Sequence, residues 1–265
     1  MKVVLFCGGL GMRLREYSDQ LPKPMVPIGY RPIIWNIMKY YAHYGHKDFI
    51  LCLGHKADMI KNYFVNYDET ISNDFVYTKG GKNIELLNTD IDDWRITFVD
   101  TGINSNIGMR LMSVKEHLKG EEVFLANYSD GLTDLNLTSM IDWFIGQKNK
   151  TAAFMAHQPT HSFHVVQRQD DGLVKSINHI GASGLFINTG YFILRQDIFN
   201  YMEWGDELVV QPFQRLIKES RLVSWEHKGF WASMDTYKDK QTLDEAHAKG
   251  NAPWEVWTKN GGQRT

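Results

Sequence analysis

The chain opens with Lys2-Val-Val-Leu-Phe-Cys-Gly-Gly-Leu-Gly-Met-Arg-Leu14, and Leu21-Pro-Lys-Pro-Met25 follows a few residues later. The first apolar residues predict a buried strand, which ends in Gly8, Gly9 and Gly11. Glycines let backbone N–H groups approach a ligand closely. Two cations follow these glycines, Arg13 in the first quoted segment and Lys23 in the second. The opening therefore predicts a loop that binds a polyphosphate.

Two familiar phosphate-binding patterns do not fit this spacing. A P-loop places Gly-Lys-Ser/Thr after its second glycine, whereas Met12 and Arg13 follow Gly11 in this chain. A dinucleotide-binding fingerprint needs a third glycine where Leu14 stands, and an acidic residue at the end of a second strand about 20 residues further on. The chain has neither, so both patterns are set aside.

Composition bounds the class of protein. With 265 residues, 43% hydrophobic and 23% charged, the chain can bury a large core as one domain or one domain with a small appendage. Its net charge of -2, with acids and bases interspersed, gives no basic stripe, so we expect neither nucleic acid nor a membrane as a partner. We expect a cytoplasmic protein, because no apolar run approaches about 18 residues and no signal-like segment opens the chain. Cys7 and Cys52 lie in apolar runs without CxxC spacing, which is typical of buried thiols in a reducing compartment.

Strands and helices alternate in the first half of the chain. The expected strands are Asp48–Leu53, Arg95–Asp100 and Glu122–Asn127, and the expected helices are Pro32–Tyr44, Ala57–Tyr67 and a stretch from Arg110 to His117. This order predicts an α/β fold with a mostly parallel sheet covered on both faces. Between Asp68 and Asp93 the periodicity weakens around Gly80-Gly81, which suggests a hairpin or an oligomer contact.

The pattern becomes less regular after about Lys150. We expect strands at Thr151–Ala156, Ser162–Gln167 and Leu185–Leu194, and helices at Leu208–Glu219 and Asp239–Lys249. The second half therefore predicts a mixed region that adds to the parallel core.

The combination Gly-Gly-x-Gly-x-Arg and Pro-Lys-Pro-Met resembles the signature of the sugar-1-phosphate nucleotidyltransferases. Further segments, in the same order, are similar to those of the glucose-1-phosphate cytidylyltransferases, which make CDP-glucose from CTP. These segments are Val99–Gly102, Gly108–Leu111, Ser129–Gly131, Ile187–Phe192, Gly229–Trp231, Met234–Thr236 and Ala252–Trp254. The resemblance covers essentially the whole chain, and the Asp-Thr-Gly segment and the Ala-Pro-Trp ending point to the cytidylyl branch.

This resemblance implies a Rossmann-like three-layer nucleotidyltransferase fold with a mostly parallel mixed sheet and a smaller acceptor-binding region. Residues 1–265 would form a single domain, with a nucleotide-binding core over 1–150 and an acceptor-binding and C-terminal part over 151–265. The implied reaction is Mg²⁺-dependent cytidylyl transfer from CTP to glucose 1-phosphate, for nucleotide-sugar and surface polysaccharide biosynthesis. We also expect a homo-oligomer.

The chemistry of this reaction explains the residue types. A sugar 1-phosphate is already an anion, so it can attack the α-phosphorus of CTP without a general base or a covalent intermediate. The protein must mainly align and neutralise phosphates, with cations and with carboxylates that hold Mg²⁺. By resemblance, Arg13 and Lys23 are the catalytic residues, and Asp130 and Asp235 bind the metal. The implied nucleotide-binding residues are Leu5, Gly8, Gly9, Leu10, Gly11, Met12, Arg13, Lys23, Arg110 and Ser129, and the implied acceptor-binding residues are His179, Asn188 and Gly190.

Without the resemblance, several of these residues have ordinary structural interpretations. Asp130 could belong to an Asp-Gly turn, Asp235 could cap a helix, and Arg110 could be a solvated helix residue. The Asp-x-Asp motif within Asp90–Asp93 could belong to a metal-dependent glycosyltransferase, but its place in the irregular excursion favours a solvated loop.

The histidines His157, His161 and His164 do not predict a zinc site. Pro159 prevents a helix there, and on a strand His161 and His164 would face opposite sides.

The chain departs from the family pattern at several positions, and these departures leave the identity of its substrates undecided. Met12 replaces the usual threonine, and Met109 and Ser129 replace common glycines. Where the family has Glu-Lys-Pro, with the lysine on the sugar phosphate, this chain reads Lys175-Ser-Ile-Asn-His-Ile-Gly181. Either a cation nearby (Lys175, His179 or Arg168) substitutes for that lysine, or the acceptor is not glucose 1-phosphate.

Two other hypotheses stay open at this point. One is nucleotidyl transfer, from CTP or UTP, to a different phosphorylated acceptor. The other is a noncatalytic nucleotide-sugar-binding subunit, against which the retention of Lys23, Asp130 and Asp235 argues.

Overall fold

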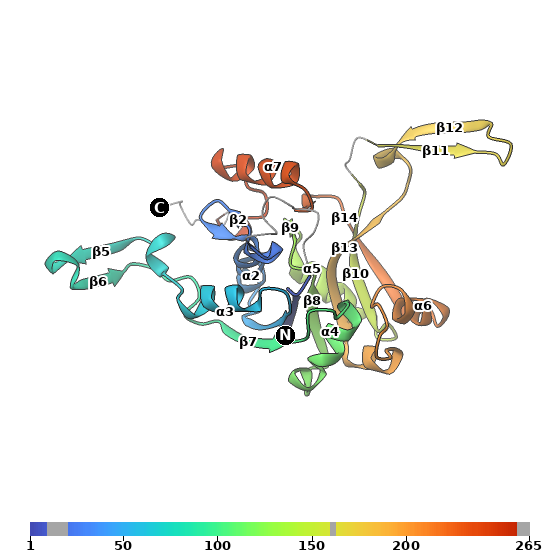
Figure 1. The fold of residues 1–265 in the computed structure, drawn as a ribbon. Coiled ribbons are helices and arrows are strands. Elements are labelled where there is room, and N and C mark those ends of the chain that lie inside the picture. Colours follow the sequence, from blue (N-terminus) through green and yellow to red (C-terminus); the bar gives the residue numbers. More distant parts are fainter. Residues whose placement is uncertain (10–20, 160–162, 259–265) are drawn as a thin grey trace.

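The apolar run that opens the chain forms the inner strand β1 (Lys2–Phe6) of the main sheet (Figure 1). The computed structural model describes residues 1–9, 21–159 and 163–258. The interior residues of β1 are fully buried, because β4 (Asp48–Leu53) and β8 (Val123–Asn127) pair with it in parallel on either side. The glycines after β1 therefore begin at the carboxyl-terminal edge of a parallel sheet, where ligands of open α/β folds bind.

In the described parts of the chain the main sheet has seven strands, in the order β14-β10-β13-β8-β1-β4-β7. The remaining strands are β7 (Arg95–Asp100), β10 (Ala152–His157), β13 (Ile187–Arg195) and β14 (Leu222–His227). Strand β13 is antiparallel to both of its neighbours, and the other pairs are parallel. The predicted mostly parallel mixed sheet is confirmed, and strands from both halves of the chain pair within it.

Helices cover both faces of this sheet, and each face has its own hydrophobic cluster. Val3 and Leu5 point to one face, whereas Val4 and Phe6 point to the other, as the alternation along a strand requires. The first cluster includes residues of α2 (Ile33–His43), α3 (Ala57–Val65), α5 (Leu137–Gly146) and α7 (Tyr237–Ala248), and the second includes residues of α4 (Ile107–Ser113) and α6 (Gln211–Lys218). The predicted three-layer arrangement is confirmed.

None of the helices in the described ranges combines the length and the apolar composition that crossing a bilayer requires.

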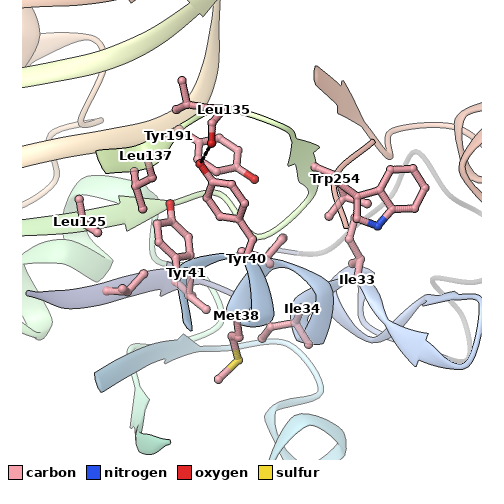
Figure 2. Close-up of a cluster of buried hydrophobic side chains, with 14 of the residues drawn as sticks. Ile33, Ile34, Met38, Tyr40, Tyr41, Leu125, Leu135, Leu137, Tyr191 and Trp254 are labelled. Atoms are coloured by element: carbon pink, nitrogen blue, oxygen red, sulfur yellow. Dashed lines mark hydrogen bonds between the residues drawn. The ribbon is translucent and has the colours of Figure 1, made fainter. Parts of the chain in front are cut away.

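Figure 2 shows the aromatic centre of the first cluster, where α2 meets the sheet and the C-terminal segment. The Tyr40 hydroxyl donates to the Leu135 carbonyl at 2.9 Å, and its ring meets that of Tyr191 edge to face. Trp254 is fully buried and its indole N–H donates to the Asn36 amide oxygen at 3.3 Å. The Ala-Pro-Trp segment near the end of the chain is therefore part of the core.

Among the described residues, four short strand pairs lie outside the main sheet. Two of them, β5 (Phe75–Thr78) with β6 (Asn83–Leu86) and β11 (His164–Arg168) with β12 (Val174–His179), project away from it as hairpins (Figure 1). The other two are β2 (Pro27–Ile28) with β3 (Arg31–Pro32) and β9 (Gly131–Thr133) with β15 (Trp231–Ser233). The hairpin predicted within 68–93 is confirmed.

The prediction of a solvated loop for Asp90–Asp93 is wrong at Asp90. The Asp90 side chain is only 7% exposed and lies between the Lys39 ammonium at 3.0 Å and the buried Arg31 guanidinium at 3.6 Å. It also accepts a hydrogen bond from the Ser72 hydroxyl at 2.6 Å. Burial alone would raise the pKa of Asp90, but the Ser72 hydrogen bond and the Lys39 charge lower it overall. Asp90 thus anchors the base of the β5–β6 hairpin to α2.

We predict that Asp90→Asn destabilises the protein by about 3 kcal/mol, because it leaves the buried Arg31 cation without its carboxylate. Denaturant unfolding at pH 7 measures this, with Asp93→Asn as the control. Asp93 is 54% exposed and pairs with Lys47, so its loss should cost less than about 1 kcal/mol. Equal midpoints for the two variants would contradict the prediction.

The same pair predicts a dependence on pH. Since the folded pKa of Asp90 is lowered, its stabilisation is present above the unfolded value of about 3.9 and is lost as the pH falls through the folded value. The difference in stability between the wild type and Asp90→Asn should therefore shrink below about pH 3.9.

Candidate active site

Three of the residues singled out by the sequence meet in one ion-pair cluster at the carboxyl-terminal edge of the sheet. The Lys23 ammonium donates to Asp130 Oδ2 at 2.8 Å and to Asp235 Oδ1 at 2.7 Å. Lys23 begins the short 3-10 helix Lys23–Met25, directly after Pro22. One cation therefore joins segments that are far apart in the sequence.

The backbone around Asp130 places its carboxylate. Ser129 is buried and has φ +66°, in the left-handed region that glycine adopts more easily. The Asn127 side chain stabilises this turn, since its oxygen accepts from the Ser129 amide at 2.7 Å. The turn explains why a glycine is common at this position, and it aims Asp130 at the edge of the sheet.

Asp235 is held next to Asp130 by the β9–β15 pair. Gly131 is paired with Ser233, and the Met234 amide donates to the Asp130 carbonyl at 2.8 Å. Thr236, not Asp235, caps helix α7, so the interpretation of Asp235 as a helix cap is wrong. The Asp235 carboxylate instead lies beside Lys23.

Electrostatics couple the three charged groups. Burial disfavours the charged form of Lys23, but Asp130 and Asp235 together raise its pKa overall, so the ammonium keeps its proton at neutral pH. Burial also raises the pKa of Asp130, and the Lys23 charge offsets this only in part. The two carboxylates thus need a cation between them.

A cavity of about 290 Å³ opens beside this cluster, under the glycines that follow β1. Gly9, Lys23 and Asp130 line one side of it, and Asn106, Ile107 and Glu207 also line it. Tyr128 lies within reach of both acids: burial and the charges of Glu207 and Asp130 raise the pKa of its hydroxyl. The lining of the cavity therefore includes both the Lys23–Asp130 pair and Glu207, with Tyr128 near both acids.

Arg110 is buried rather than solvated, with 2% exposure, so the interpretation as a surface helix residue is wrong. Its guanidinium donates to the Gly8 carbonyl at 2.9 Å, to the Thr101 hydroxyl at 2.7 Å and to the Leu53 carbonyl at 3.1 Å. These groups follow or end β1, β7 and β4, so Arg110 joins the ends of three strands. A Cβ on Gly8 would lie 2.0 Å from Arg110 Nη1, so a larger residue there would displace the guanidinium. The predicted contact of Arg110 with a nucleotide stays a prediction.

Two of the predicted acceptor residues lie against Tyr128, on the wall of the cavity. The Asn188 amide donates to the Tyr128 hydroxyl at 3.4 Å. Gly190 has φ +82°, and a Cβ there would lie 2.4 Å from the Tyr128 ring. Asn188 and Gly190 are therefore close to the cluster through one shared side chain.

His179 does not join them. It is exposed at the end of β12 on the projecting hairpin, and its ring packs edge to face against His164. Its predicted contact with an acceptor stays a prediction.

The other predicted site residues divide into two groups. The Leu5 side chain is fully buried in the core, whereas Gly9 and Ser129 line the cavity and Gly8 packs on Arg110. The remaining predictions, at Leu10, Gly11, Met12 and Arg13, lie outside the described residues.

Cys7 also lines the cavity, but burial raises the pKa of its thiol to about 12, which makes it a poor nucleophile.

Tyr128, Asn106, Ile107 and Glu207 are cavity residues that the sequence did not single out. Only Asn106 had a local signal, since its side chain caps α4 by accepting from the Met109 amide at 2.8 Å.

Of the three histidines considered for a zinc site, His161 lies outside the described residues. His157 Nδ1–H donates to the His227 carbonyl at 2.9 Å, and His164 lies on the β11–β12 hairpin. In the ranges that the structure describes, no group of three or more His, Cys, Asp or Glu is arranged to hold a metal ion.

Comparison with known proteins agrees with this geometry. Residues 2–231 match the family described as nucleotidyl transferase. The glucose-1-phosphate cytidylyltransferase of Salmonella typhi is 39% identical over 263 residues, which cover 97% of this chain and 100% of that protein. The probable glucose-1-phosphate cytidylyltransferase of Bacillus subtilis strain 168 is 34% identical over 259 residues, covering 97% and 100%.

Solved structures show the same fold at low identity. The UTP-bound UGPase from Acinetobacter baumannii has a TM-score of 0.68 and 18% identity, and covers 97% of this chain and 96% of that chain. A UDP-glucose pyrophosphorylase complexed with UDP-glucose also has a TM-score of 0.68, with 16% identity and 94% and 98% coverage. The family match and the nearly full-length relatives lead to one conclusion: the chain belongs to the nucleotidyl transferase family.

Proposed function

We propose that the protein transfers a cytidylyl group from CTP to glucose 1-phosphate, giving CDP-glucose and pyrophosphate. The observation that supports this best is the Lys23 ammonium between two carboxylates at the mouth of a cavity lined by glycine backbone. The names of the relatives that match nearly the full chain support the choice of CTP and glucose 1-phosphate.

The chain's own groups account for the transfer. An oxygen of the acceptor phosphate forms a bond to the α-phosphorus as the bond from that phosphorus to the pyrophosphate oxygen breaks. No protein base is needed, because the attacking oxygen is already ionised at neutral pH. The Lys23 ammonium neutralises the charge that gathers on the two approaching phosphates, and the backbone N–H groups of the glycine loop orient the leaving group.

Asp130 and Asp235 would hold Mg²⁺. Their oxygens already converge on one cation, Lys23 Nζ, and magnesium is commonly held by one or two carboxylates together with substrate phosphates. When bound, the metal would neutralise phosphate charge and polarise the phosphorus–oxygen bond. Lys23 could then exchange a carboxylate partner for a phosphate.

Asp130→Asn should lower turnover by about 100-fold or more, because one of the two metal-binding charges is lost. Pyrophosphate release from CTP and glucose 1-phosphate in Mg²⁺ measures this. Asp142→Asn, an exposed residue of α5, is the control with the same change of charge. Full activity of Asp130→Asn, or of the wild type in excess EDTA, would contradict the proposed metal site.

Lys23→Ala should lower kcat more than it weakens CTP binding, because a contact between the reacting phosphates strengthens as they approach. Steady-state kinetics and calorimetry with CTP separate the two effects. Lys249→Ala, a surface residue paired with Glu245, is the control and should change neither. Abolished CTP binding with unchanged kcat would show that Lys23 contributes to CTP binding only and not to the transfer step.

A second candidate is transfer to another phosphorylated acceptor. It is favoured by the Asn178–Ile180 stretch, which lacks the family's lysine, and by the exposed position of His179 on the projecting hairpin.

Loss of a charge-assisted contact to the acceptor phosphate should lower the affinity for glucose 1-phosphate by about ten- to hundredfold. The variant His179→Lys should recover part of this lost affinity. The acceptor KM for the parent and for this variant, measured with glucose 1-phosphate and a panel of phosphorylated sugars, tests the second candidate. A low KM for glucose 1-phosphate in the parent that survives mutation of Lys175, His179 and Arg168 would exclude a role for the missing lysine.

We also infer that the chain forms a homo-oligomer in the cytoplasm. The β5–β6 hairpin exposes apolar side chains, including Tyr77 and Ile84, on a strand pair that is rarely stable alone in water. A monomeric mass in light scattering would contradict this inference.

A further inference from the structure

The cavity has a wall that phosphate chemistry does not use. Besides Lys23 and Asp130, the lining of the cavity includes Asn106, Ile107, Arg110 and Glu207, and the Tyr128 hydroxyl senses the charges of both Asp130 and Glu207. A nucleotide that placed its phosphates at Lys23 would therefore have its base within reach of this second wall.

Glu207 is held firmly on that wall. Its Oε2 accepts from the Ile107 amide at 3.4 Å, and the Asn106 side chain donates to the Gly205 carbonyl at 2.9 Å. A Cβ on Gly108 would lie 2.1 Å from the Asp206 carbonyl oxygen, so the two segments touch through their backbones. The backbone of 205–207 thus packs against 106–108, and the Ile107 amide joins the Glu207 carboxylate to that contact.

Within residues 1–9, 21–159 and 163–258, no cation pairs with the Glu207 carboxylate. In the part of the chain that the structure describes, its partners are the backbone amides of Ile107 and Leu208, and burial raises the pKa of its carboxyl. A carboxylate in this setting repels a triphosphate. It accepts hydrogen bonds from neutral N–H groups here, so a neutral donor on a bound ligand suits it.

We propose that Glu207 selects the base of the nucleotide: its carboxylate accepts a hydrogen bond from the exocyclic amino group of cytosine. Uracil carries a carbonyl oxygen where cytosine carries that amino group, so two acceptors would face each other. This inference rests on the proposed function, because it assumes that the cavity binds a pyrimidine nucleoside triphosphate. It adds a residue that distinguishes CTP from UTP.

The test compares Glu207→Gln with the wild type. The amide keeps the size of the side chain and can donate to the uracil carbonyl, whereas the loss of the charged acceptor weakens the contact with cytosine. The ratio of CTP to UTP affinity should fall by about ten- to hundredfold, the value of one hydrogen bond to a charged group. Calorimetry with each triphosphate and Mg²⁺ measures the ratio without any acceptor. Glu203→Gln is the matched control, since Glu203 is exposed nearby on the same segment and faces Arg215.

A fall in the ratio for Glu207→Gln but not for Glu203→Gln supports the inference. An unchanged ratio, or an equal loss of both nucleotides, overturns it, because Glu207 would then only support the cavity wall. Measurements on the wild type also distinguish failure of the proposed reaction from failure of the role assigned to Glu207. Selective CTP binding that depends on Glu207, without pyrophosphate release from CTP and glucose 1-phosphate, would overturn the proposed reaction and leave the assignment of Glu207 standing.

Discussion

The ion-pair cluster of Lys23 with Asp130 and Asp235 is the contact on which the rest of the site depends. It forms in a partly buried place, where isolated charges are costly and each member is stable only because the others are present. Removing one carboxylate or the ammonium leaves unbalanced charge at the edge of the sheet. In the proposed reaction, phosphates and a divalent cation would replace the contacts that hold the cluster together.

Two residues beside the cavity, Ser129 and Arg110, adopt locally unfavourable arrangements. Ser129 accepts a left-handed backbone, which costs roughly 1 kcal/mol for a residue that is not glycine. Arg110 gives its hydrogen bonds to strand ends instead of to a carboxylate. Both residues sit next to the cavity, and both shape backbone that a ligand would meet. Locally unfavourable conformations are thus found where the site needs a defined backbone geometry.

Elements with a strong local sequence pattern were predictable, whereas features that depend on contacts between distant segments were not. Strands β1 and β4 were predicted because strands buried on both faces read as continuous apolar runs. Strand β14 was missed because it lies at an edge and its residues alternate between partly buried and exposed. Helix α5 was also missed, although Asn136 provides a cap at its start.

The site divides in the same way. Lys23, Asp130 and Asp235 were found because they belong to recognisable motifs. Glu207 and Tyr128 belong to none, and their position on the cavity follows from contacts between segments about 100 residues apart. The burial of Asp90 was missed for this reason too, since its partners Arg31 and Lys39 come from another part of the chain.

The hydrogen bond between Lys23 and Asp235 spans 212 positions of sequence, and Trp254 docks on α2 later still. During synthesis the glycine loop, Lys23 and the inner strands leave the ribosome long before these last segments. The emerging chain can pair β1 with β4 and β8, but it cannot complete the charge cluster until its final segment arrives. The charge cluster is thus completed only after Asp235 has been synthesised, 212 positions after Lys23.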